Sequence, residues 1–414
     1  MEGHKKGKMG RKKKILLAVA GAVLLAVIIF IIYKLVVKQQ MDEETAPRES
    51  WTTETGELLE TNQNRKIRIY QAPGESDLLI YQMQPQEVEN DGFTYYNLKV
   101  QERLDSALGE LKEQEAYTLE KPLAVWNPYG TGSNGLYLYF EAPGEGLTVH
   151  YRIHVEDGEI PDFEADANAG SGTEKEFLVI GLVPGMENEL EITLNAEDGT
   201  AVQTVSFRVE APETASGYNV VLEETQGESS QELTDGLYYT LGIQGYYGHM
   251  FLFDNDGVLR YEMLLDGYKP DRVLFDGEDM VCCVSANQIG KISPLGKVTN
   301  LYTMNGYVMH HDFCYGEDGT LLVLATRKNA RDSGVMDRVL EIDMETGTVT
   351  EIVDLRRILP DYYAETEKVT ETDPFFWQAG TRDWIHVNTI DYMDDDSIVL
   401  SARETSTIVK IQDL

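Results

Sequence analysis

Cysteine is scarce in this sequence, which has only Cys282, Cys283 and Cys314 among its 414 residues. Three cysteines cannot build a disulfide framework, so the fold must depend on its hydrophobic core. Cys282 and Cys283 are neighbours in a predicted strand and should therefore point to opposite faces of a sheet. We predict that all three cysteines are small buried hydrophobic residues.

Basic residues are also scarce once the first 40 residues are set aside. That N-terminal stretch holds nine of the 35 Lys and Arg residues and one acid, which leaves 26 bases against 70 acids in the rest. Such an acidic surface repels a phosphate backbone, so no nucleic-acid partner is expected. The length and the 42% hydrophobic content indicate a folded protein of two or more domains.

A glycine-rich phosphate-binding loop is absent from the sequence, so a group transfer here would not use a nucleotide cradle of that type. We expect no cofactor. The run Asp254–Gly257 begins like a calcium-binding loop but lacks the later glutamate at the required spacing. It is better explained as a tight turn in a hairpin.

A long hydrophobic run, Ile15–Tyr33, carries no charge and is long enough to cross a bilayer as a helix. Basic residues precede it, so we predict a cytoplasmic tail over 1–14, a transmembrane signal anchor over 15–37 and a body outside the cell. The protein would then be a single-pass protein of the cell membrane. A cleaved signal peptide is the alternative, although its apolar region should be shorter. Residues 38–65 are polar and indicate a stalk.

The body begins with short predicted strands. Residues 66–212 alternate apolar and polar positions between Pro-Gly, Asp-Gly and Glu-Gly turns, which is typical of a small β-sandwich. One helix is predicted within this domain, over Val100–Gln114. Its apolar face holds Leu104, Leu108 and Leu111.

Residues 213–414 repeat a unit of strand, acidic-Gly turn, strand and second hairpin. Four-stranded repeats of roughly forty residues predict β-propeller blades, of which we count about three and a half. The fold class is therefore all-β apart from the anchor, with Leu355–Arg382 as an expected insertion. Because an open propeller exposes strand edges, we expect this chain to be a fragment of a longer protein. The alternative is that a partner chain closes the ring.

Two predicted hairpins share a pattern of polar residues. In each, a histidine begins the inner strand and an arginine ends the returning strand: His310 and Arg327 first, then His386 and Arg403. The open ends of such hairpins lie on one rim of a propeller channel, so these residues and His311 should gather near the axis. Asp312 and Asn388 occupy matching positions two residues after the histidines. Asn388 lies opposite Arg403 if the turn has four residues, and a three-residue turn shifts the pairing by one.

Such a cluster suits an oxyanion such as sulfate, phosphate or carboxylate. Arginine offers a planar fork of donors, and histidine can donate to an anion, transfer a proton or attack as a nucleophile. A metal site is the alternative, although His310 and His311 cannot face one ion without a bulge. Its ligands would be His310, His311, His386 and Asp383. A structural role for any single histidine and an exposed salt bridge for either arginine are the simplest explanations. Phe375, Phe376 and Trp377 are candidates for a lid or for buried anchors of the insertion.

Four motifs resemble those of the bacterial aryl-sulfate sulfotransferases, which do not use the nucleotide sulfate donor. They are MHHDF at Met309–Phe313, the run Asp383–Arg403, VWNPYG at Val125–Gly130 and VIGLVPGMENELEI at Val179–Ile192. The resemblance covers residues 120–414, and the motifs of the two domains agree in order. It implies a six-bladed propeller behind a small β-sandwich. It also implies a ping-pong transfer of a sulfuryl group from an aryl sulfate to a phenol through a histidine.

The resemblance carries roles onto residues of this chain. One of His310 and His311, together with His386, Asn388 and Arg403, would hold the sulfuryl oxygens. His386 would also assist proton transfer. We add two candidate substrate-binding residues, Arg327 from the first of the two similar hairpins and Trp384 from the run Asp383–Arg403.

One departure from the family concerns the nucleophile. The family's nucleophilic histidine lies further along the propeller than the arginine matched by Arg403, and this sequence has no histidine after His386. The resemblance therefore implies that this chain is inactive alone. The alternative function is a non-catalytic extracellular propeller that binds an anionic or aromatic ligand. Whether the protein forms a homodimer is left open by the sequence.

Overall fold

The computed structural model describes most of the chain after residue 66. The described residues are 67–72, 74–85, 94–223, 227, 234–244, 247–267, 271–317, 319–328, 334–368, 381–393, 395–412 and 414, with two short strands, β1 (Thr52–Thr53) and β2 (Gly56–Glu57). The predicted tail (1–14), the predicted anchor (15–37) and most of the stalk lie outside these residues, as do Phe375, Phe376 and Trp377. Within the described part of the chain, the helices are too short or too polar to cross a membrane.

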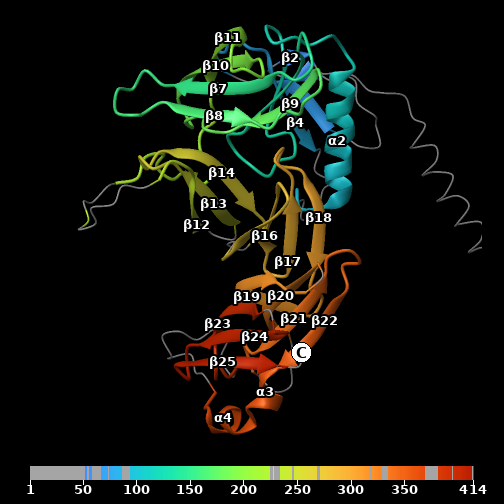
Figure 1. Ribbon diagram of the computed structural model, residues 1–414, viewed down its shortest axis with the longest axis vertical. Helices are drawn as coiled ribbons and strands as arrows, with labels where there is room; N and C mark the ends of the chain where they lie inside the picture. The colour runs from blue at the N-terminus through green and yellow to red at the C-terminus, as the bar shows by residue number, and fades with distance from the viewer. Residues whose placement is uncertain are drawn as a thin grey trace, which may run out of the picture.

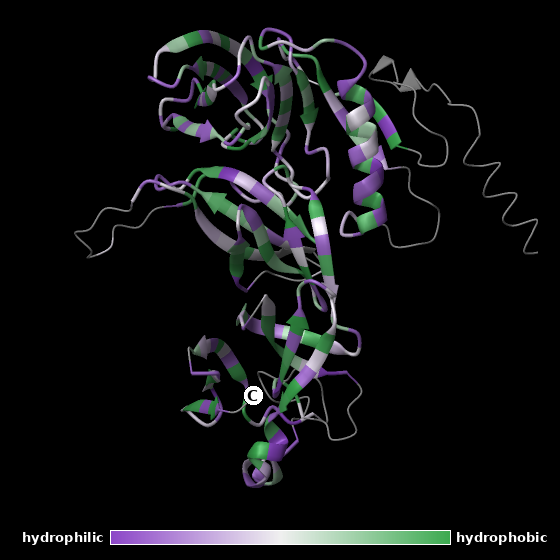
Figure 2. Ribbon diagram, turned by 45° about the vertical axis from the view of Figure 1, so that its right-hand side comes forward, coloured by the Kyte–Doolittle hydropathy of each residue, from purple (hydrophilic) through white to green (hydrophobic). Residues whose placement is uncertain are grey.

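Two packed sheets form the N-terminal part of the body. One sheet has the order β3-β4-β5-β6-β9 and the other the order β11-β10-β7-β8. The first comprises β3 (Ile67–Gln71), β4 (Ile80–Pro85), β5 (Leu123–Trp126), β6 (Leu136–Glu141) and β9 (Glu174–Val179). The second comprises β7 (Thr148–His154), β8 (Phe163–Ala167), β10 (Glu187–Asn195) and β11 (Ala201–Glu210). Buried positions alternate along β7 and β10. Figure 2 shows hydrophobic and hydrophilic residues interleaved along the strands of the body. This period of two places one face of each sheet in a shared core.

A single long helix, α2 (Leu98–Lys112), lies against this sandwich (Figure 1). Asn97 caps it by accepting from the backbone N–H of Lys99 at 3.0 Å. The predicted helix is confirmed, with both ends two residues earlier, and its three leucines are buried. Gln101, which is buried on the same face, accepts a hydrogen bond from the backbone N–H of Val298 at 3.0 Å. The helix therefore ties the sandwich to the sheets that follow.

Four antiparallel sheets come next, each an up-and-down meander, and we number them meander sheets 1 to 4. Sheet 1 is β12 (Tyr238–Gln244), β13 (Tyr247–Phe253) and β14 (Leu259–Leu265), and sheet 2 is β15 (Val273–Asp276), β16 (Asp279–Ser285), β17 (Gln288–Ile292) and β18 (Val298–Thr303). Sheet 3 is β19 (Tyr307–Tyr315), β20 (Thr320–Arg327), β21 (Arg338–Asp343) and β22 (Val349–Asp354), and sheet 4 is β23 (Val387–Met393), β24 (Ser397–Ala402) and β25 (Thr407–Gln412). Two short helices, α3 (Leu355–Ile358) and α4 (Pro360–Glu365), begin the predicted insertion. Figure 1 shows the four sheets following one another in chain order away from the sandwich.

Successive meander sheets bury their faces against each other. One core lies between sheets 1 and 2, a second between sheets 2 and 3, and a third between sheets 3 and 4. This arrangement explains why β20 is almost continuously buried, whereas β25 alternates between exposed and half-buried positions. The described sheets form an open series rather than a closed ring.

The cysteines show the same packing. Cys282 belongs to the core between sheets 1 and 2, and its neighbour Cys283 to the core between sheets 2 and 3. Cys314 lies in the core between sheets 3 and 4. Burial raises the pKa of both the Cys282 and Cys314 thiols to about 12, so neither is a reactive thiolate at neutral pH. The prediction of small buried residues on opposite faces is confirmed.

Candidate functional site

The predicted site residues meet where sheets 3 and 4 lie side by side (Figure 1). His311 lies in an irregular part of β19, where Met309 pairs with Ala325 and Phe313 with Val323, so that three residues oppose one. His386 directly precedes β23, which has its own bulge at Asn388. Both histidines have left-handed backbones, with φ of 59° for His311 and 48° for His386. Such conformations are uncommon outside glycine and are found preferentially at functional positions.

A chain of polar contacts starts from these two rings. Nε2 of His311 lies 2.9 Å from Nε2 of His386. Nδ1 of His386 lies 2.7 Å from Oδ2 of Asp383, and Nη2 of Arg403 lies 3.1 Å from the same oxygen. A carboxylate only accepts, so Nδ1 of His386 donates to Asp383, and its Nε2 is left to share a proton with His311. The arrangement is an Asp-His-His relay with an arginine beside it.

Burial differs along this chain. His386 is 6% exposed and the Asp383 side chain 9%, whereas the Arg403 side chain is 42% exposed. The backbone N–H of Arg403 donates to the carbonyl of His386 at 3.0 Å, which holds the arginine beside the histidine. The buried end of the relay is thus rigidly held, and its cationic end reaches solvent.

His310 lies behind the relay rather than in it. Its ring packs edge-on against that of His311, with centroids 5.4 Å apart, and it is only 4% exposed. Burial lowers its pKa to about 3, and both of its ring nitrogens lack a hydrogen-bond partner among the described residues. Of the two neighbouring histidines, His311 is the one that contacts His386.

Asp312 connects three sheets. Its carboxylate lies 2.9 Å from Nε of Arg272, which precedes sheet 2, and accepts from the backbone N–H of Ile390 in sheet 4 at 2.9 Å. It also accepts from the N–H of Phe313 in its own strand. Sequence reasoning matched Asp312 to Asn388 but missed both this role and Arg272.

Three predicted residues lie away from the relay, contrary to the expectation of a common rim. Arg327 is exposed at the end of β20, opposite Tyr307. The turn before β24 has three residues, so Asn388 does not lie opposite Arg403, and a separate register shift between Val387 and Thr389 leaves Asn388 as the unpaired residue of a bulge. The backbone N–H of Arg403 bonds to His386 instead. Trp384 is 2% exposed and points into the core between sheets 3 and 4, where its Nε1 donates to Oδ2 of Asp337 at 2.8 Å. As placed here, Trp384 is a buried anchor and does not face the relay.

The acidic side chains near His386 raise the question of a metal. Ligand atoms of Asp383, His386 and Glu404 lie within 4.8 Å of one another. However, Arg403 lies between the two carboxylates, 3.1 Å from Asp383 and 2.6 Å from Glu404. A guanidinium in that place supplies the positive charge that a metal ion would bring, so these residues fit an oxyanion site better than a metal site.

Comparison with known proteins identifies both parts of the body. The family described as Arylsulfotransferase (ASST) matches residues 222–413, and the Arylsulfotransferase Ig-like domain matches residues 123–212. The first of these matches covers the meander sheets, and the second covers the sandwich from β5 onward. A search among curated proteins found no match.

Some solved structures show weak likenesses. A protein of unknown function from Bacteroides caccae is 11% identical at a TM-score of 0.27, covering 64% of this chain and 90% of its own. The WD40 β-propeller domain of Doa1 is 12% identical at a TM-score of 0.26, covering 72% of this chain and 97% of its own. The Neurospora crassa Pan2 WD40 domain is 11% identical at a TM-score of 0.24, covering 68% and 88%. At these TM-scores the likenesses decide nothing about this chain.

Proposed function

Because the chain belongs to the arylsulfotransferase family, we propose that it transfers a sulfuryl group from an aryl sulfate to a phenol. The transfer would proceed in two steps through a sulfo-histidine that the relay itself does not supply, with the meander sheets as blades of a propeller around the site. By itself this chain is then expected to bind an aryl sulfate without turning it over. One observation carries the proposal: Asp383, His386 and His311 form a hydrogen-bonded relay, with Arg403 beside it.

The relay suits an anion with several oxygens. A sulfuryl oxygen that enters between the two rings replaces the 2.9 Å contact and accepts from Nε2–H of both His311 and His386. His386 is then an imidazolium, which the Asp383 carboxylate stabilises through Nδ1. Arg403, which is paired with Asp383 and Glu404, adds guanidinium donors at the exposed side.

Proton movement follows from the same contacts. In the first step the ester S–O bond breaks while an N–S bond forms to the nucleophilic histidine, and the Nε2 proton of His386 moves from its hydrogen bond with the sulfuryl oxygen to the leaving phenolate. In the second step the acceptor phenol gives its proton back to His386 as its oxygen attacks the sulfur and the N–S bond breaks. His311 and His386 hold oxygens and move protons in this proposal, and neither accepts the sulfuryl group.

The test combines binding with turnover. Titration calorimetry with 4-nitrophenyl sulfate should show binding to the wild-type chain, and nitrophenol release in the presence of phenol reports transfer. Replacing His386 with Asn, which tolerates a left-handed backbone, should abolish binding. The exposed His154 in β7 provides the matched control, and His154→Asn should bind like the wild type.

The outcomes separate two candidate functions. Binding to this chain, with release when the protein is expressed from its complete reading frame, supports the transferase. Binding without release from either protein favours a non-catalytic propeller that holds an anionic aromatic ligand, a function that the partly exposed Arg403 and the buried relay also suit. If the wild-type chain neither binds 4-nitrophenyl sulfate nor releases nitrophenol, both proposals fail.

A membrane location is proposed from the sequence alone. The basic tail and the apolar run Ile15–Tyr33 support a single-pass anchor with the acidic body outside the cell. Protease added to intact cells should then remove the body, whereas full protection of the body would contradict this orientation.

A further inference from the structure

The segment that carries Asp383 and His386 has few hydrogen bonds of its own and is held by another segment. Residues Gly334–Asp337 run beside Arg382–Val387, and a parallel bridge joins Gly334 to Arg382. The N–H of Val335 donates to the carbonyl of Arg382 at 3.1 Å, and the N–H of Val387 to the carbonyl of Met336 at 3.2 Å. We call Gly334–Asp337 the clamp.

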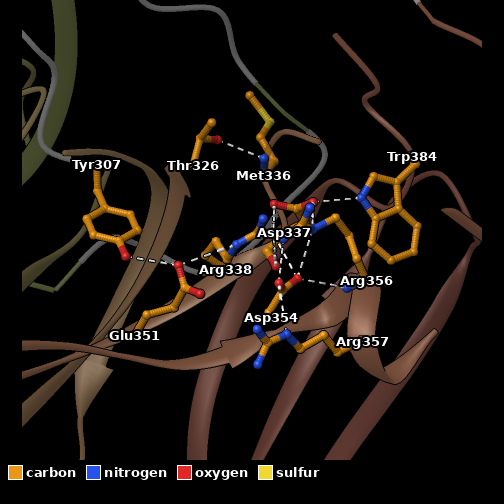
Figure 3. Close-up of polar contacts among 10 residues, drawn as sticks. All are labelled: Tyr307, Thr326, Met336, Asp337, Arg338, Glu351, Asp354, Arg356, Arg357 and Trp384. Carbon is orange, nitrogen blue, oxygen red and sulfur yellow. Dashed lines mark hydrogen bonds and ion pairs between the residues drawn. The ribbon is translucent and has the colours of Figure 1, made fainter. Parts of the chain in front are cut away.

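Side chains strengthen the clamp at both ends. Nε1 of Trp384 donates to Oδ2 of Asp337 at 2.8 Å, and the N–H of Met336 donates to Oγ1 of Thr326 at 2.7 Å (Figure 3). Met336 itself has a left-handed backbone with φ of 53°. Asp383 and His386 thus flank Trp384, which is fixed in the core, so the direction of their side chains depends on where the clamp holds this tryptophan.

Asp337 is itself fixed by a buried network of charges. It and Arg338 are both fully buried and paired, and Arg338 also lies 3.2 Å from the carboxylate of Asp354 at the end of β22. Nε of Arg356, the second residue of α3, donates to Asp354 at 2.9 Å (Figure 3). A Cβ at position 334 would collide with the Asp337 carboxylate, which leaves room only for glycine there. The network therefore gives the clamp one position relative to sheet 3, because any displacement would unpair a buried charge.

We propose that Thr326, Asp337 and Trp384 are positioning residues that set the orientation and tautomer of His386. The proposal rests on the proposed function, since it assigns to these residues the alignment of the relay that binds the sulfuryl group. None of the three contacts the relay's ring nitrogens, so they act through the backbone of Arg382–Val387. Trp384, which the sequence suggested as a substrate contact, acts on the site from the core side.

Near-isosteric variants test this without emptying the core. Trp384→Phe removes the N–H that meets Asp337, and Thr326→Val removes the oxygen that meets Met336. Glu351→Gln is the matched control: Glu351 lies 3.5 Å from Nε of Arg338 and accepts from Tyr307 at 2.9 Å, on the side of the network away from the clamp (Figure 3). The three proteins should lose comparable stability in urea.

Two readouts separate positioning from general stability. Imidazole ¹⁵N spectra of ¹⁵N-histidine protein, assigned with His386→Asn, should show Nδ1 of His386 protonated in the wild type and in Glu351→Gln. In Trp384→Phe and Thr326→Val, a second tautomer with Nε2 protonated should appear. Binding of 4-nitrophenyl sulfate should weaken about fivefold in the two clamp variants, as expected when one hydrogen bond that aligns the site is lost.

The results also distinguish this inference from the proposed function. If the wild type binds 4-nitrophenyl sulfate but the clamp variants keep its tautomer and affinity, the positioning role is overturned and the function stands. If the tautomer shifts only in the clamp variants while the wild type binds no aryl sulfate, positioning stands and the proposed function falls. Equal shifts in Glu351→Gln and the clamp variants would also overturn the positioning role.

Discussion

Meander sheets 3 and 4 carry the same pattern of histidine, acid or amide, and arginine, yet the structure uses the pattern differently. In sheet 3, Asp312 is buried and joins three sheets, while Arg327 points to solvent. In sheet 4, Asn388 is a bulge residue, while Arg403 lies beside His386. Among the described residues, sheet 3 is covered on both faces and sheet 4 on one. The position of a sheet in the series of meander sheets therefore decides whether its polar residues support the fold or the site.

The largest difference between the sheets should appear at Asp312 and Asn388. Asp312→Ala leaves Arg272 and the N–H of Ile390 without their acceptor and should cost about 2–3 kcal/mol of unfolding free energy, less than a fully buried pair because Arg272 is partly exposed. Asn388→Ala should cost less than about 1 kcal/mol. Urea midpoints measure both. Equal losses would remove the distinction between the two positions.

The next largest effect should be the contribution of His310 to the pH dependence of stability. Its folded pKa of about 3 lies below the value of 6.5 for a free histidine, so below pH 6.5 the unfolded chain binds a proton that the folded chain does not. The wild type therefore loses stability as pH falls from 6.5 toward 3, by about 1.4 kcal/mol per unit from this residue. His310→Leu has no such titration. The unfolding free energy of the variant relative to that of the wild type should therefore rise by about 2 kcal/mol between pH 7 and pH 5.

Urea titrations of both proteins at pH 5 and pH 7 measure this difference. A constant offset between wild type and His310→Leu at the two pH values would contradict the neutral, buried state of His310.

A smaller effect should separate the two arginines. Arg403→Gln removes the cation beside Asp383 and should weaken 4-nitrophenyl sulfate binding about tenfold. Arg327→Gln, the matched change in sheet 3, should leave the affinity unchanged because this arginine lies opposite Tyr307, away from the relay. Calorimetric titration with 4-nitrophenyl sulfate measures the affinity of both variants. An equal loss of affinity in both would show that Arg327 also contributes to the site.

The smallest effect is expected at the outer strands. Ile408 in β25 is 70% exposed, so Ile408→Thr should change the unfolding free energy by less than about 0.5 kcal/mol. Val353 in β22 is 3% exposed in the core between sheets 3 and 4. Val353→Thr should lower the unfolding free energy by roughly 1 kcal/mol or more, because the threonine hydroxyl is buried there. If Ile408→Thr proved the more damaging change, the outer face of sheet 4 would be covered in solution.

Much of the fold was predictable because it depends on periodic patterns. The helix over Leu98–Lys112 followed from leucine spacing, and the opposite directions of Cys282 and Cys283 followed from strand geometry. The site was predictable only in composition. His311, His386 and Arg403 do meet, but the bulges that bring them together come from register shifts that no residue spacing announces. The buried role of Trp384 was missed because aromatic residues serve cores and ligands alike.

By itself the sequence determined the all-β character of the body and the family resemblance, because strand periodicity and contiguous motifs are local properties. Only the tertiary structure decided which histidine meets His386, where Asp312 and Arg327 point, and how Asp337 holds the segment of His386. The physical reason is that each of these contacts joins residues far apart in the chain. Their distances depend on register and on the packing of neighbouring sheets, which a linear pattern does not contain.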